Sequence, residues 1–312
     1  MGAGVHTSLK RLISLRYHAR GFSYIPRQPV HSVLAGRKRS RLRGRGLDFD
    51  ELRHYRPGDD IRTMDWRVTR RMGSPFVRVY TEEKDRPVWL VVDQRVSMFF
   101  GSRRQMKSVA AAEAAALTAW RVIAAGDRVG ALLFNDSQQT YARPSRAANS
   151  MMRWLDQMAS MNQALGSRLA STTASGLEEA LSTLQRHISH DGLVIIISDF
   201  EGWDERCLRR LKDIRQRNDV IAAVVTDPLE HSVESADKLI VSDGYYQLAV
   251  AKESDETQRR FRQAFQRRLT DLTENLKRHA IPLIPITTTA DVATQLQRQL
   301  GGQQRGIYGA HQ

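Results

Sequence analysis

Short apolar runs alternate with longer helical patterns over most of this 312-residue chain, and this alternation constrains the fold more than any other feature. Runs such as Val88 to Val92 and Leu193 to Ile197 are apolar at every position. They lack the alternation of apolar and polar residues that is typical of a strand with one solvent-exposed face. Strands of this kind are typical of parallel sheets covered by helices on both faces. We therefore predict a doubly wound α/β fold with a mainly parallel sheet.

The expected elements follow from hydrophobic periodicity. The strands expected are Phe76 to Tyr80, Val88 to Val92, Val129 to Phe134, Leu193 to Ile197, Val220 to Thr226 and Ile281 to Ile286, with a short hairpin over Lys238 to Val250. The helices expected are Arg104 to Ala125, Met151 to Met161, Gly176 to Ile188, Glu205 to Arg217, Glu256 to His279 and Ala290 to Leu300. We place the α/β domain at residues 84–300, after a partly flexible basic arm (1–46) and a short segment (47–83), and before a flexible tail (301–312).

The positive charge is concentrated in the arm. Net charge is +14, and residues 1–46 carry eleven lysines and arginines and no acid. Such an arm either binds phosphates of nucleic acid or anionic lipid, or packs on an acidic face of its own domain or of a partner. The longest apolar run is too short to span a bilayer, so we predict no transmembrane segment and a cytoplasmic protein.

A dense charged block spans Gly46 to Trp66 and contains the tight-turn sequence Pro57-Gly58-Asp59-Asp60. It resembles the signature of a bacterial family, domain-of-unknown-function family 58 (DUF58). The residues that match the signature are Gly44, Gly46, Phe49, Leu52, Arg53, Tyr55, Pro57, Gly58, Asp59, Asp60, Arg62, Asp65 and Trp66. The resemblance implies a von Willebrand A-like domain that works with a MoxR-type AAA+ ATPase. Alternatively, the charges form a network that ties this segment to the main domain.

Two aspartates follow apolar strands, Asp93 and Asp199, and the carboxyl ends of such strands are where open α/β sheets bind ligands. The resemblance implies a metal-ion-dependent adhesion site here, made from Asp93, Ser97, Ser175 and Asp199. Carboxylate and hydroxyl oxygens suit Mg²⁺.

Arg95 departs from the adhesion-site pattern, because it stands where a serine ligand is expected. If its guanidinium points inward, it replaces the cation by pairing Asp93 with Asp199 and leaves a metal-free site. If it points outward, a poorer Mg²⁺ site remains. A third alternative is that these residues only cap helices and seal loop ends.

The sequence holds no recognised nucleophile elbow, zinc motif or phosphate-binding loop. The single cysteine, Cys207, excludes an internal disulfide. We therefore expect a non-enzymatic adaptor. The two alternatives are an Mg²⁺-dependent phosphohydrolase that uses Asp93 and Asp199, and a protein that binds nucleic acid through residues 1–46. The residues expected to contact a partner are Arg95, Trp203, Arg53, Tyr55, Asp59, Asp60, Arg62, Asp65 and Trp66.

Overall fold

A six-stranded sheet organises most of the chain in the computed structural model, which describes residues 4–24, 47–82, 86–166, 176–231, 239–242, 247–250 and 255–301. The chain divides into two compact units. One contains residues 1–26 and 86–312, and is called the α/β unit; the other contains residues 27–85, and is called the signature unit.

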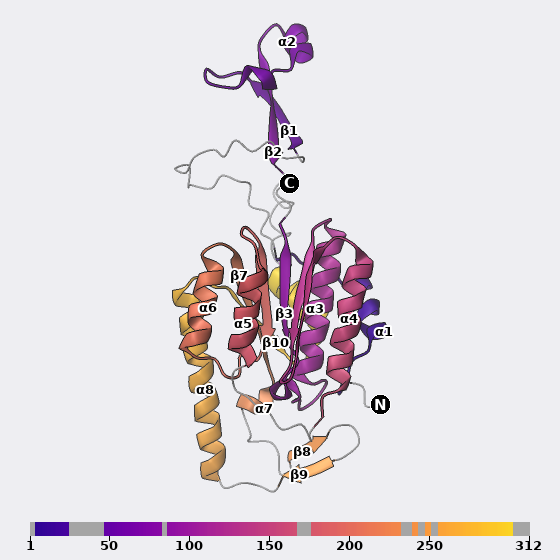
Figure 1. The fold of residues 1–312 in the computed structure, drawn as a ribbon, viewed down its shortest axis with the longest axis vertical. Helices are drawn as coiled ribbons and strands as arrows, with labels where there is room; N and C mark the ends of the chain where they lie inside the picture. The colour runs from indigo at the N-terminus through magenta and orange to yellow at the C-terminus, as the bar shows by residue number, and fades with distance from the viewer. Residues whose placement is uncertain are drawn as a thin grey trace, which may run out of the picture. The chain divides into compact units, whose positions relative to one another are not determined.

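The large sheet has the order β10-β7-β6-β3-β4-β5 (Figure 1). Its strands are β3 (Val88–Asp93), β4 (Val129–Phe134), β5 (Gln139–Ser145), β6 (Leu193–Ser198), β7 (Asp219–Thr226) and β10 (Leu283–Thr287). All neighbours are parallel except β5, which runs antiparallel to β4. Numbered in chain order the strands read 3-2-1-4-5-6, the order of doubly wound folds. The predicted fold class is confirmed.

Both faces of the sheet are buried because helices cover them. Val88, Leu90 and Val92 of β3 point into one apolar cluster, and Trp89 and Val91 point into another on the opposite face. The first cluster is covered by α1 (Leu9–Ser14), α3 (Lys107–Ala124), α4 (Ala148–Gln163) and α9 (Val292–Leu300). The second is covered by α5 (Gly176–His187), α6 (Glu205–Arg215) and α8 (Asp255–Arg278), as Figure 1 shows. This double cover explains why the central strands are apolar throughout.

The edge strand β5 was not expected, because its sequence is polar and contains Pro144. Proline is tolerated at a sheet edge, where its missing N–H faces no partner strand. The pairing with β4 shifts register between Val129 and Ala131. Gly130 sits at this irregularity, where a Cβ would lie 2.6 Å from the carbonyl oxygen of Ala142. The antiparallel edge is thus a tertiary feature that the periodicity of the sequence does not reveal.

The N-terminal residues pack on the α/β unit, which differs from the boundary we placed at residue 46. Helix α1 and the 3₁₀ turn η1 (Leu15–Tyr17) bury Leu12 and Leu15 in the first cluster. Arg11 pairs with Glu113 of α3 at 2.8 Å, and Trp120 donates a hydrogen bond to the carbonyl of Leu12. For residues 4–24 the structure agrees with the alternative of an arm packed on its own domain.

Leu12→Ala should therefore destabilise the whole α/β unit. Leu12 is fully buried, and removing its side chain leaves a cavity worth about 3 kcal/mol of unfolding free energy. Chemical denaturation followed by circular dichroism measures the change, and Tyr17→Ala, an exposed neighbour, is the matched control. An unchanged midpoint for Leu12→Ala would mean that this segment does not belong to the folding unit.

The signature unit is a hairpin with a helical tip. Strand β1 (Leu47–His54) pairs antiparallel with β2 (Phe76–Glu82), and the pair His54–Phe76 closes the register at the tip. The connection contains the 3₁₀ turn η2 (Ile61–Thr63) and the helix α2 (Trp66–Met72). The strand expected from Phe76 is confirmed, whereas β1, rich in acids, was not expected.

Three smaller elements complete the described chain: α7 (Pro228–His231), and β8 (Leu239–Ser242) paired antiparallel with β9 (Gln247–Val250). This pairing confirms the expected hairpin. Among the helices of the described residues, none has the length and apolar character that a membrane span requires. The tail expected at 301–312 lies outside the described residues from position 302 onward.

Candidate interaction site at the switch point of the sheet

The two predicted aspartates meet where the strand order reverses. Asp93 is the last residue of β3, and Asp199 directly follows β6, the neighbouring strand. The connection after β3 leads to β4 on one side, whereas β6 lies on the other side. Ligands in open α/β sheets bind at this kind of switch point, outside the carboxyl ends of the strands.

Arg95 points inward and clamps Asp93. Its backbone N–H and its Nε donate to Oδ1 of Asp93, both at 3.0 Å, and its Nη2 donates to Oδ2 at 2.7 Å. The hydroxyl of Ser198 also donates to Oδ2, at 2.6 Å. Asp93 is 0% exposed and Arg95 is 3% exposed. The pair is therefore a buried, bidentate salt bridge, a geometry that guanidinium favours.

The remaining surroundings enclose the guanidinium of Arg95. Its Nη2 donates to the carbonyl of Glu201 at 3.0 Å and lies 3.8 Å from Oδ1 of Asp199. The ring of Phe134 lies 5.5 Å from the guanidinium carbon. Gly176, the first residue of α5, closes another side, since a Cβ there would lie 3.1 Å from Cδ of Arg95. Within the described residues, Arg95 is therefore enclosed and 3% exposed.

A second buried cation, Lys107, neutralises Asp199. Its Nζ donates to Oδ2 of Asp199 at 2.8 Å and to Glu230 at 2.6 Å, and Lys107 is 2% exposed. Burial disfavours its charge, but the carboxylates of Asp199 and Glu230 outweigh this and raise the pKa of Lys107. Burial likewise works against the charge of Asp199, yet Lys107 and Arg95 lower its pKa. The site is thus ionised and internally paired.

Sequence reasoning missed Lys107 and Glu230. Lys107 is the first residue of α3, a helix otherwise dominated by buried alanine. A lone lysine at the start of such an apolar helix is a signal for a buried ion pair, because an unpaired charge there would be very unfavourable. Glu230 lies in α7, and nothing in its local sequence links it to Asp199.

The residues present do not fit Mg²⁺ as they are arranged. Both oxygens of Asp93 accept hydrogen bonds from Arg95, and Oδ2 of Asp199 accepts one from Lys107. Among the described residues no three His, Cys, Asp or Glu side chains group closely enough to hold a metal ion. The Oγ of Ser97 is buried and has no hydrogen-bond partner within the described part of the chain. Ser175, the fourth predicted ligand, lies outside it.

The loop after β6 forms the rim of the site. Phe200 is buried with a φ of 55°, a left-handed conformation that is uncommon for a residue with a side chain. This turn directs the carbonyl of Glu201 toward Arg95. It leaves Trp203 half-buried, edge-on to Phe200 and packed against the second apolar cluster.

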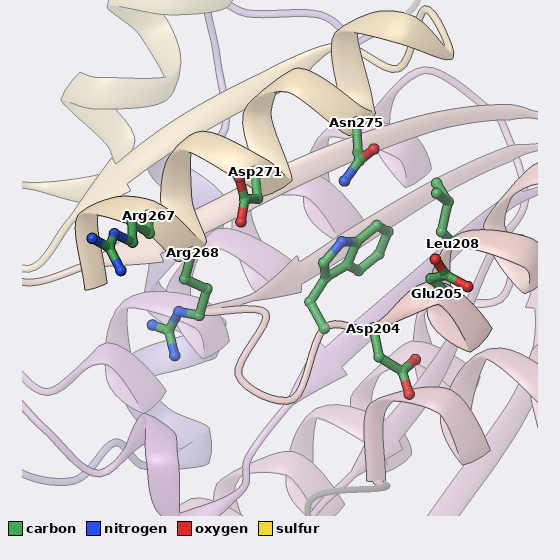
Figure 2. A pocket seen from close by; sticks show the side chains of 8 residues that line it. Asp204, Glu205, Leu208, Arg267, Arg268, Asp271 and Asn275 are labelled. Atoms are coloured by element: carbon green, nitrogen blue, oxygen red, sulfur yellow. The ribbon is translucent and has the colours of Figure 1, made fainter. Parts of the chain in front are cut away.

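A pocket of about 480 Å³ opens beside Trp203, between α6 and α8 (Figure 2). Arg267 and Arg268 lie at one end and Asp204 and Glu205 toward the other, and Trp203 also lines the pocket. Arg268 pairs with Glu201, whose carbonyl holds Arg95. The loop after β6 therefore contacts Arg95 through the carbonyl of Glu201 and lines the pocket with Trp203. The pocket is the accessible surface next to the buried charges.

Most predicted contact residues of the signature unit form hydrogen bonds or ion pairs within that unit. Arg53 forms a bidentate pair with Asp59, with both distances 2.8 Å. Asp65 caps α2 through the N–H groups of Arg67 and Val68 and pairs with Arg78.

Asp60 caps η2 by accepting from the backbone N–H of Arg62, and Tyr55 is half-buried, with its N–H bonded to the carbonyl of Pro75. Among the contact residues predicted in this unit, Arg62 and Trp66 have exposed side chains that take no part in these stabilising contacts of the described residues.

Cys207 is a residue of α6 and is fully buried. Burial raises the pKa of its thiol to about 11, so it stays protonated at neutral pH. It therefore does not supply a thiolate nucleophile.

The fold and the site together define a doubly wound α/β protein whose switch-point carboxylates are neutralised by its own cations. The chain belongs to the family described as "Protein of unknown function DUF58", which matches residues 51–275. It is 29% identical over 290 residues to uncharacterized proteins of Mycobacterium tuberculosis (Rv1480 in strain H37Rv) and Mycobacterium bovis, covering 92% of this chain and 89% of theirs.

Solved structures with a similar arrangement include BatB from Bacteroides thetaiotaomicron, at 12% identity and a TM-score of 0.41, covering 69% of this chain and 96% of that one. The von Willebrand A domain of SpRpn10 is similar at 11% identity and a TM-score of 0.37, covering 69% and 94%. The fold assignment rests on the strand order above rather than on these distant similarities.

Proposed function

We propose that this chain is a non-enzymatic protein-interaction domain that contacts its partner at the switch-point rim without a metal ion. The observation that carries the proposal is the buried pairing of Arg95 with Asp93. A permanent guanidinium supplies the positive charge that a cation supplies at adhesion sites of this class. The carboxylates then hold the loops in place, and recognition falls to the accessible rim, where Trp203 offers an aromatic anchor.

We further propose, from the family resemblance, that the partner is a MoxR-type AAA+ ATPase and that the pair works in the cytoplasm. The rim is suited to a protein partner because it combines an aromatic surface with charges of both signs. Arg267 would attract an acidic side chain of the partner toward Trp203.

The test is capture of the purified MoxR-type ATPase from the same host by the full chain. Wild type and Arg153→Ala, an exposed change on α4, should capture it equally. Trp203→Ala should weaken capture about thirtyfold, because a central aromatic anchor contributes on the order of 2 kcal/mol. Capture by wild type should survive EDTA in the absence of nucleotide. Loss of capture with EDTA would overturn the metal-free site, and no capture by any variant would overturn the partnership.

The two other functions lack such support. A phosphohydrolase needs Asp93 and Asp199 free to hold Mg²⁺, and both are paired with cations. Hydrolysis of a generic phosphodiester that Asp93→Asn abolishes would revive it. Nucleic-acid binding would depend on the basic run 37–45, which lies outside the described residues. Salt-sensitive binding of an oligonucleotide that is lost on removing residues 27–46 would support that function.

A further inference from the structure

Apolar side chains are exposed at the tip of the signature unit in an unusual concentration. Large apolar residues that are well exposed are few in the described chain, and Trp66, Met72 and Ile61 are among them, at 66%, 61% and 60%. All three lie in the connection between β1 and β2, in η2 and α2 (Figure 1). Exposed apolar groups gathered in one small unit mark an interaction surface rather than random exposure.

The same tip carries arginines with no acid to pair with. Arg56, Arg62, Arg67, Arg70 and Arg71 are all exposed, and none of them forms an ion pair among the described residues. Of the three acids in the connection between β1 and β2, Asp59 binds Arg53, Asp65 binds Arg78, and Asp60 caps η2. The pairing of these acids leaves the outer face strongly cationic.

Helical geometry places the aromatic and the charges together. At about 100° per residue, Arg67, Arg70 and Arg71 fall within an arc of roughly 100° on α2, and Trp66 lies next to it. Thr69 faces the opposite way, where its hydroxyl accepts a hydrogen bond from the N–H of Phe76 in β2. The outward face of α2 is thus an arginine surface with Trp66 at its edge, and we call it, together with the exposed Ile61, the tip surface.

We propose that the tip surface binds an acidic amphipathic segment of a partner protein. Arginine forks bind carboxylates bidentately, and Trp66 and Ile61 are covered best by apolar side chains. A segment with acidic and apolar residues supplies both. This inference rests on the proposed interaction function, but not on the identity of the ATPase or on the switch-point rim.

A membrane or a nucleic acid fits the tip surface less well. An interfacial helix inserts one continuous apolar face, whereas arginines occupy the arc beside Trp66, and Met72 projects elsewhere around the helix. Nucleic-acid phosphates would satisfy the arginines but would leave Ile61 without an apolar contact. The experiment below therefore includes a membrane and a nucleic acid as competing ligands.

The experiment measures binding of a labelled synthetic helical peptide, with glutamates on one face and leucines on the other, to the full chain by fluorescence polarisation. The matched probe carries lysine in place of each glutamate. Wild type should bind the glutamate peptide at least about tenfold more tightly than the lysine peptide, as charge complementarity requires. Trp66→Ala, and separately the triple change Arg67→Gln, Arg70→Gln and Arg71→Gln, should each weaken binding about tenfold.

The control removes the same charge from exposed positions of the α/β unit, Arg153→Gln, Arg186→Gln and Arg209→Gln, and should leave binding unchanged. Thermal unfolding of each variant verifies that the fold is retained. Equal binding of both peptides, or unchanged binding by the tip variants, would overturn the proposal. So would tighter, tip-dependent binding to phosphatidylglycerol vesicles or to an oligonucleotide. Loss of ATPase capture by Trp203→Ala with intact peptide binding separates this proposal from the previous one.

Discussion

Lys107→Met should lower the free energy of unfolding of the α/β unit by about 3–5 kcal/mol, since breaking a buried salt bridge leaves an unpaired charge behind. Lys107 contacts two carboxylates, Asp199 and Glu230, and all three groups are buried. Methionine keeps most of the volume of lysine, so the loss reports the charge rather than a cavity. Denaturant unfolding at neutral pH measures it.

The control for this change is Lys277→Met, at an exposed position on α8, which should alter stability by less than about 0.5 kcal/mol. A loss below about 1 kcal/mol for Lys107→Met would mean that the pair does not stabilise the site. Stabilisation by the methionine would show that desolvation of the three charges outweighs their attraction.

The stability of the α/β unit should fall at both high and low pH because of the Lys107–Asp199 pair. The pKa of Lys107 is raised on folding, so its contribution is complete below the ordinary lysine value of about 10.4 and is lost as pH rises through its folded pKa. The pKa of Asp199 is lowered, so its contribution is complete above about 3.9 and is lost as pH falls through its folded pKa. The contribution of the pair to wild-type stability should be constant in between.

Arg95→Ser should cost a similar amount, about 3–5 kcal/mol, in the absence of divalent cations. The change leaves Asp93 buried, with the hydroxyl of Ser198 as its remaining side-chain partner among the described residues. It also places a serine oxygen where an adhesion site has one, beside the unpaired Oγ of Ser97. Mg²⁺ should therefore restore part of the lost stability, which thermal unfolding with EDTA or with millimolar Mg²⁺ measures.

Two comparisons keep the prediction for Arg95→Ser specific. Wild type should unfold at the same temperature with Mg²⁺ and with EDTA. In the double change Asp93→Asn with Arg95→Ser, the rescue by Mg²⁺ should disappear, because a carboxylate ligand is gone. Stabilisation of wild type by Mg²⁺ would contradict the metal-free site, and no rescue of Arg95→Ser would show that the remaining oxygens do not form a cation site.

Part of the site could be located from local sequence. Asp93 and Asp199 each end an apolar strand, and the carboxyl ends of parallel strands meet at one edge of the sheet. Arg95 stands out because it interrupts a pattern of hydroxyl residues. Its direction remained open, since the two alternatives differ only in a side-chain rotamer. The fold resolves this by surrounding the guanidinium with Asp93, Phe134 and the carbonyl of Glu201.

The sequence by itself determined the class of fold and the edge of the sheet where the charges lie, because apolar periodicity and strand ends are local properties of the chain. Only the tertiary structure decided the antiparallel edge strand β5, the burial of residues 4–24 and the pairing of Lys107 with Asp199 and Glu230. Those partners are separated by 92 and 123 residues. The local sequence around a charged residue does not indicate which distant residue will pair with it. The interaction free energy of the pair depends on the tertiary structure, because folding brings the two charges together and removes both from water.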